Sequence, residues 1–145
     1  MFGSAQRGAS TYAKIGIETG VVAASPHKLI IMLFEGAMTA IAMAGMHMRS
    51  MNIKDKGEAI TKAILIVENG LRASLDLSES PGRDMALNLD ALYDYMSRRL
   101  FEANVNNDPA ILNEVHELLS GLKEAWEAIG DPVAIAAITR NQSAA

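Results

Sequence analysis

Four segments of the sequence repeat apolar residues at alternating spacings of three and four, and this pattern limits the possible folds more than any other feature. Such spacing places the apolar side chains on one face of an α-helix. Strands need strict alternation and favour β-branched residues, and these segments lack both. The four apolar faces are Ile30, Leu33, Ala37, Ala40 or Ile41, Ala44 and Met48; Ile60, Ile64, Val67, Leu71 and Leu75; Met85, Leu89, Leu92, Met96, Leu100 and Ala103; and Leu112, Val115, Leu119, Leu122, Trp126 and Ile129. The sequence therefore predicts an all-α fold.

Capping and turn residues separate the four segments. Ser25-Pro26 and Asp108-Pro109 each join an N-cap side chain to a proline at the first helical position. A polar break at 52–56, turn residues at 78–82 and Gly130 mark other ends. Short connections leave consecutive helices side by side, which predicts an up-down antiparallel four-helix bundle. The predicted helices cover about 26–51, 55–76, 84–104 and 109–129.

Both ends of the chain differ in composition from the predicted bundle at 25–130. Residues 1–24 are rich in Gly, Ala, Ser and Thr, with an apolar cluster that includes Tyr12 and Ile15, and we expect a mobile N-terminal arm. Residues 131–145 form a short C-terminal tail, in which Asp131-Pro132 could begin one more short helix. A chain of 145 residues suits a single domain.

One predicted helix resembles a membrane span, because Leu29–Met48 is almost entirely apolar and about as long as a bilayer requires. The polar residues of this segment nevertheless fall on one narrow stripe, as in a core helix with one solvent-exposed edge; they are Lys28, Glu35, Thr39 and Arg49. An unpaired Glu near the bilayer centre would also cost a few kcal/mol. We expect no membrane insertion and, since residues 1–10 lack an apolar signal region, a location in the cytosol.

Composition and spacing argue against most kinds of chemistry. The chain has no Cys, and its net charge of -4 without any Lys/Arg run is unfavourable for nucleic-acid binding. None of His27, His47 and His116 has a Glu three residues before it, as a di-metal site in a bundle would need. Phosphate-binding glycine loops and nucleophile elbows are also missing from the sequence. We expect no catalytic residues, no metal and no cofactor, and therefore a binding protein.

Several apolar residues fall off the predicted core stripes and are candidates for binding a partner. They are Leu65, Ile66, Leu87 and Phe101, with Tyr93 and Tyr95 on either side of the third stripe. They could line a groove for an amphipathic helix, with walls of Met43, Met46, Met85 and Met96 that repack around it. They could equally serve as a third core position per heptad. Arg98 and Arg99 could pair with Glu102 or receive the acidic groups of a partner.

Five short motifs occur in a fixed order along the chain: ASPHKLIIMLFEGA at 24–37, KAI at 62–64, SLD at 74–76, NLDALYDYMSRRL at 88–100 and EAW at 124–126. In this order they resemble the FliS family of flagellar secretion chaperones. The resemblance covers roughly residues 12–129. It implies a bacterial cytosolic chaperone that binds new flagellin, prevents its premature polymerisation and keeps it competent for type III export, without a nucleotide or cofactor.

The resemblance also implies where and how the client binds. The client is flagellin's disordered C-terminal segment, which forms helices as it wraps around the bundle, and the export gate or another flagellar regulator is a further candidate partner. Tyr12 looks like the counterpart of a Tyr in the family's arm, and Phe34 stands where the family often has Tyr. The expected client-binding residues are Tyr12, Ile15, Leu65, Ile66, Leu87, Tyr93, Tyr95, Met96, Arg99 and Phe101. The alternative is a self-associating structural module, such as a weak homodimer.

Overall fold

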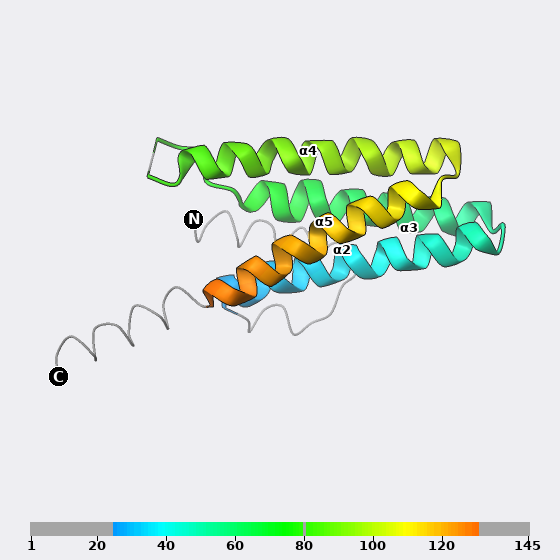
Figure 1. Cartoon of the computed structure of the whole chain (residues 1–145), viewed down its shortest axis with the longest axis horizontal. Helices are drawn as coiled ribbons and strands as arrows, with labels where there is room; N and C mark the ends of the chain where they lie inside the picture. Colours follow the sequence, from blue (N-terminus) through cyan, green and yellow to red (C-terminus); the bar gives the residue numbers. More distant parts are fainter. Residues whose placement is uncertain (1–24, 80, 131–145) are drawn as a thin grey trace.

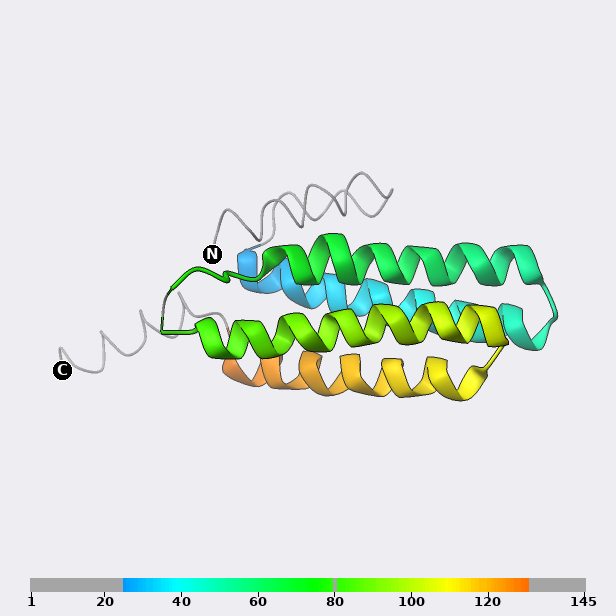
Figure 2. The same ribbon diagram turned by 90° about the horizontal axis from the view of Figure 1, so that it is seen from above.

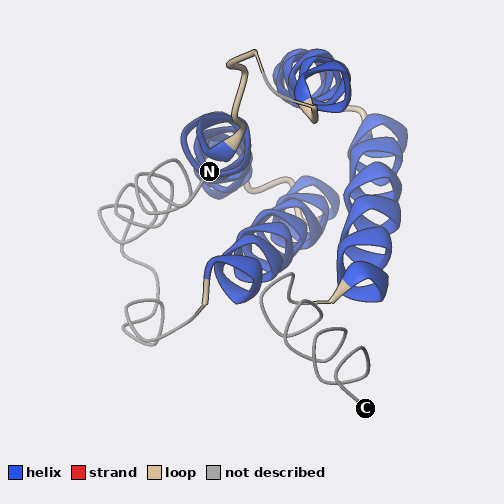
Figure 3. Cartoon of the chain, turned by 90° about the vertical axis from the view of Figure 1, so that its left-hand side faces the viewer, coloured by secondary structure: helices blue, strands red, loops and turns tan. Residues whose placement is uncertain are grey.

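The computed structural model describes residues 25–79 and 81–130, and its regular elements are helices. Helices and loops are the only elements in this part of the chain (Figure 3), so the all-α prediction is confirmed. The predicted arm at 1–24 and tail at 131–145 lie outside the described residues. The elements are α2 (Pro26–Arg49), α3 (Ile53–Leu65), the π-helical turn η2 (Ile66–Leu71), the 3-10 turn η3 (Arg72–Ser74), α4 (Arg83–Asn106) and α5 (Pro109–Ile129).

The four long helices form an up-down bundle in which each packs on two others, and the first and last of them also lie side by side. α2 packs on α3 and α5, and α4 packs on the same two helices, which closes the ring. Figures 1 and 2 show the helices side by side along a common direction. Trp126 near the end of α5 stacks on His27 at the start of α2, with ring centroids 5.5 Å apart. This contact shows that the two helices run antiparallel.

Local chemistry at the ends explains why the helices begin and stop where they do. The Ser25 side chain accepts a hydrogen bond from the Lys28 amide at 3.2 Å, and Asp108 accepts one from Ala110 at 2.9 Å. α2 ends at Arg49 because Met51 has a φ of 57°, and the Asn52 amide then donates to the His47 carbonyl at 2.9 Å. This is the Schellman arrangement, with methionine where glycine is usual.

The buried core runs the length of the bundle and contains most of the predicted apolar faces. Met85 and Ile129 are exceptions, being 70% and 55% exposed. Asp90 of α4 pairs with Arg72, which lies two residues before the helical run of α3 ends at Ser74. Met85 lies five residues before Asp90 on the antiparallel α4, so it extends past that end and has no helical turn of this run beside it. The core consists of Leu29, Ile30, Leu33, Phe34, Ala37, Ala40, Ile41, Ala44, Met48, Ile60, Ala63, Ile66, Val67, Leu71, Tyr93, Met96, Leu100, Ala103, Ile111, Leu112, Val115 and Leu119.

The second helical run, predicted as one α-helix over 55–76, covers 53–74 and changes type along its length: it is α-helical to Leu65, π-helical over Ile66–Leu71 and 3-10 helical over Arg72–Ser74. A π-turn holds more residues than an α-turn and so shifts the phase of the apolar face. Ile66 and Val67 are both fully buried as a result. Gly70 in this turn is buried against α2, where a Cβ would come within 2.8 Å of Leu33 Cδ2. The close approach of η2 to α2 here favours glycine, since a larger residue would have to displace the Leu33 side chain.

Lys56 is a buried cation that the sequence placed in a polar break. It lies in the first turn of α3 and is 4% exposed. Its ammonium donates to the Asn104 carbonyl at 3.1 Å and to Asn107 Oδ1 at 3.0 Å. Asn107 has a φ of 53°, a conformation that Asn tolerates better than most residues. The side chain therefore ties the start of α3 to the end of α4.

α2 is the one helix of the described residues that is long and apolar enough to cross a membrane. It also contributes more residues to the buried core than any other helix, and these extend from Leu29 to Met48. Core helices of soluble proteins pass the same test of length and composition. The packing of α2 against α3 and α5 therefore accounts for its apolar character without a bilayer.

Candidate functional site

Large apolar side chains remain exposed on the outer surface of α3 and α4. Leu65 on α3 and Leu87 and Phe101 on α4 are exposed, as predicted, and Phe101 is 65% accessible. Val105, four residues after Phe101, is equally exposed and was missed by the sequence analysis. Spacing of i and i+4 places both on one helical face, so the sequence contained the information needed to find it. These residues give the bundle an apolar surface that its own packing does not use.

Three of the predicted client-binding residues lie in the core. Ile66 and Tyr93 are buried, so the expectation that they lie off the core is wrong, whereas Met96 is buried as its place on the third apolar face predicts. The π-turn brings Ile66 inward. Tyr93 and Met96 are three residues apart on the buried face of α4, and burial raises the pKa of the Tyr93 hydroxyl. Their role in binding stays a prediction, and the expected contacts of Tyr12 and Ile15 lie outside the described residues.

Two further predicted binding residues, Tyr95 and Arg99, are engaged within the bundle. Both donate to Glu114 of α5, the Tyr95 hydroxyl at 2.7 Å and Arg99 Nε at 2.8 Å, while Arg99 Nη1 also reaches Glu102 at 2.8 Å. The guanidinium and then the hydroxyl hold the pKa of Glu114 below its usual value. In this conformation the cluster joins α4 to α5.

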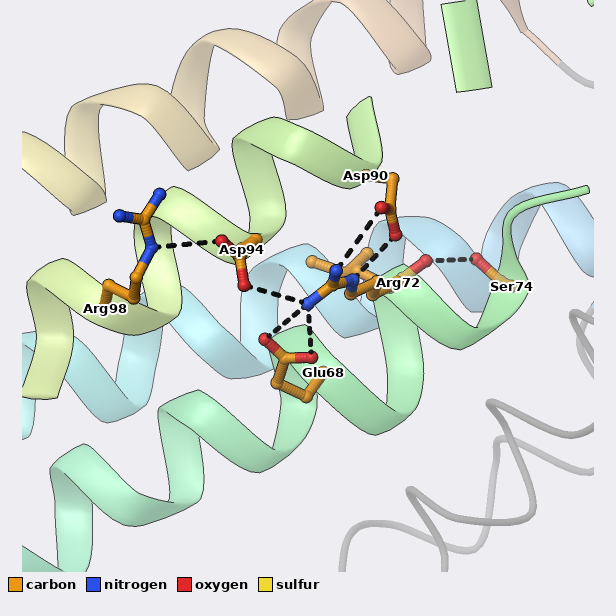
Figure 4. Close-up of polar contacts among 7 residues, drawn as sticks. Glu68, Arg72, Ser74, Asp90, Asp94 and Arg98 are labelled. Carbon is orange, nitrogen blue, oxygen red and sulfur yellow. Dashed lines mark hydrogen bonds and ion pairs between the residues drawn. The ribbon is translucent and has the colours of Figure 1, made fainter. Parts of the chain in front are cut away.

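A second polar cluster joins the end of the α3 segment to α4. The Arg72 guanidinium contacts Asp90 at 2.7 Å, Glu68 at 3.0 Å and Asp94 at 3.2 Å, and Asp94 also pairs with Arg98 (Figure 4). The hydrogen bond from Arg72 lowers the pKa of Asp90. Sequence analysis missed this cluster because its contacting residues lie up to 22 positions apart and meet only after α3 and α4 have paired.

Two hollows flank α3 and share the exposed side chains of Glu58 and Lys62. One lies between α2 and α3 and has a volume of about 700 Å³. The other lies on the far side of α3, has a volume of about 620 Å³ and contains Ile53 and Leu65 among its lining residues. Both are open surface features with apolar and charged walls, which suits another polypeptide better than a small molecule.

The titratable side chains of the described residues do not form a metal site. Within 25–79 and 81–130 no three His, Asp or Glu side chains come close enough together to hold an ion. The acidic clusters are instead organised around Arg72 and Arg99 as ion pairs between helices. The ion-pair clusters hold the helices together, and the bundle then presents the exposed apolar side chains on a stable scaffold. Such a scaffold suits the binding of another chain.

Comparison with known proteins places this bundle in one family. The family model described as "Flagellar protein FliS" matches residues 8–133. The flagellar secretion chaperone FliS of Salmonella typhimurium is 47% identical over 122 residues, which cover 84% of this chain and 89% of that protein. The Escherichia coli FliS is 43% identical over 85% of this chain and 89% of its own length. The Bacillus subtilis FliS is 32% identical over 76% and 79%, respectively.

These matches span the four helices and the motifs on which the resemblance rested. The chain therefore belongs to the FliS family of flagellar secretion chaperones.

Proposed function

We propose that this protein binds the C-terminal segment of flagellin in the bacterial cytosol, prevents its premature polymerisation and keeps it competent for flagellar type III secretion. The observation that carries the proposal is the set of large apolar side chains that a folded bundle leaves exposed, with Phe101 as the most accessible of the expected client-binding residues in the described part of the chain. Exposed apolar surface of this kind is typical of sites that bind another chain.

Membership of a chaperone family implies a protein that acts on a client by binding, not by catalysis. The curated relatives are named flagellar secretion chaperones, so the client is a protein bound for the flagellum. When a disordered segment folds as it binds, the conformational entropy that it loses offsets part of the favourable interaction free energy. Affinity then stays moderate, which favours release at the export gate. We expect no nucleic acid, cofactor or membrane to take part.

The test is calorimetric titration of the full chain with a peptide of the last forty or so residues of flagellin from the same organism. Coupled folding and apolar burial predict a one-to-one isotherm with a negative heat-capacity change. Absence of heat and of any complex would contradict flagellin binding.

Self-association through the same exposed residues is the competing function. It would make the molar mass of the free protein rise with concentration in light scattering. A monomeric mass together with peptide binding would reject it.

A further inference from the structure

The groove between α2 and α3 has the shape of a site for one more helix. Small residues form its floor, with Gly36 and Ala40 on α2 and Ala59 on α3, and Met32 and Met43 lie among its walls. Small side chains let helix axes approach closely, and methionine adapts to an irregular neighbour. The α2 lining runs from residue 32 to residue 47, which at 1.5 Å per residue is about 22 Å, or roughly four helical turns.

The rim of this groove is acidic, and its charged side chains form no ion pair within the described bundle. Glu35, Asp55 and Glu58 line it together with a single ammonium, that of Lys62. Asp55 accepts a hydrogen bond from Asn52. Across 25–79 and 81–130, no ion pair forms at Glu35, Glu58 or Lys62. A rim with more carboxylates than ammonium groups attracts positive charge and selects against acidic partners.

We propose that the α2–α3 groove docks an amphipathic helix of the client, and that Glu35 and Glu58 select a helix flanked by Lys or Arg. This inference rests on the proposed function, and it assigns to two acidic residues the choice of which segment binds. The apolar floor provides burial, while the rim fixes orientation and rejects segments with acidic flanks. Phe101 and Val105 lie on α4, outside the groove lining, so the two surfaces can be tested separately.

Two pairs of matched variants of the full chain separate the groove from the rest of the surface. Glu35→Gln with Glu58→Gln neutralises the rim, and Glu117→Gln with Glu124→Gln removes the same charge from exposed positions on α5. Met43→Ser removes an apolar wall, and Ile129→Ser changes an apolar residue of similar exposure at the end of α5, outside the groove lining. All four positions in the charge variants are exposed, so each protein should fold.

The probe is the flagellin C-terminal peptide, together with a version in which every Lys and Arg is replaced by Gln. Neutralising the rim should weaken binding of the native peptide about twofold to fivefold for each ion pair lost, and this effect should shrink at about 0.5 M NaCl. The Gln-substituted peptide should bind the wild-type protein more weakly than the native peptide does. It should also bind the wild-type protein and the rim variant with equal affinity. Met43→Ser should lower affinity at least about fivefold, and both control variants should match the wild type.

Failure of the inference differs from failure of the proposed function. If the native peptide does not bind the wild-type protein, the proposed function fails and the groove loses its client. If it binds and all groove variants match the wild type, the groove assignment is wrong while the function stands. Tighter binding by the groove variants would mean that the chain's own residues 1–24 compete for the groove. If the groove variants change only the molar mass of the free protein and not its affinity for the peptide, the groove binds a second copy of this chain instead of the client.

Discussion

Glycine shows most directly how a single residue fits the bundle. Gly57 and Gly70 lie in the same helical run, but an added Cβ meets nothing within 4 Å at Gly57 and meets Leu33 at Gly70. Gly57→Ala should raise the free energy of unfolding by about 0.5–1 kcal/mol through helix propensity. Gly70→Ala should be less stable than Gly57→Ala by about 1–3 kcal/mol, because Leu33 is itself enclosed by the core. Urea unfolding of both variants measures the difference, and equal stabilities would contradict the close approach of η2 to α2.

The exposed face of α4 permits a test in which stability and binding separate. Phe101 is 65% exposed, so Phe101→Ala should change the free energy of unfolding by less than about 0.5 kcal/mol. If the α4 face contacts the client, the same change should weaken flagellin peptide binding about tenfold. Ile129→Ala, at a similarly exposed position at the end of α5, is the control and should leave affinity unchanged. Equal affinities for both variants would remove Phe101 from the binding surface.

At the scale of helices, the contact between α4 and α5 depends on a cluster that the sequence had assigned to the client. Arg99 donates to Glu114, and the distance is 2.8 Å. Arg99→Ala should lower the free energy of unfolding by about 1 kcal/mol, because Glu114 loses its charged partner in a half-buried position. Thermal unfolding at fixed pH measures this loss. A stable Arg99→Ala variant that fails to bind the peptide would restore Arg99 to the client site.

The pairing of Arg72 with Asp90 predicts how acid affects the contact between the α3 segment and α4. The folded pKa of Asp90 lies below its ordinary value of 3.8. The pair therefore contributes stability above that value and loses it as the pH falls through the folded pKa. Asp90→Asn should be less stable than the wild type at pH 7 and should lose less stability on acidification to pH 3. Urea unfolding at several pH values tests this, and parallel curves for the two proteins would contradict it.

Helix starts could be predicted from the sequence, whereas the phase of the helices could be predicted only in part. Ser25-Pro26 and Asp108-Pro109 act through backbone groups within three residues, so local chemistry suffices. The π-turn and the buried Lys56 depend on partners 30 or more residues away, namely Leu33 for Gly70 and Asn104 and Asn107 for Lys56. A helical wheel assumes constant phase, and it therefore placed Ile66 outside the core.

The candidate site was predicted less well than the fold for a related reason. Leu65, Leu87 and Phe101 were correctly identified as exposed because each lies far from its core stripe. Tyr93 flanks the stripe, and residues at its border turn inward or outward according to how neighbouring helices pack. Glu35 lies within the 24–37 motif and Glu58 within none, but neither was predicted to bind a client, because only the pairing of α2 with α3 brings them to the rim of one groove.

For the whole molecule, the core defines which part of the chain can fold alone. The buried apolar cluster extends from Leu29 to Leu119, and the described residues include both N-caps and the contact between His27 and Trp126. Deleting residues 1–24 should therefore leave a cooperative bundle with an unchanged helical circular dichroism signal per residue of the bundle. Because Tyr12 and Ile15 are expected client contacts, the truncated chain should differ from the full chain in its affinity for the flagellin peptide.

The two measurements on this truncated chain distinguish how folding and binding are divided along the sequence. A folded bundle with altered affinity would assign residues 1–24 to binding and 25–130 to the scaffold. A folded bundle with unchanged affinity would remove Tyr12 and Ile15 from the client site while leaving the α4 face and the α2–α3 groove as candidates. Loss of cooperative unfolding would show that the core that begins at Leu29 does not stabilise the bundle by itself. The bundle would then need apolar residues from the preceding segment to remain folded.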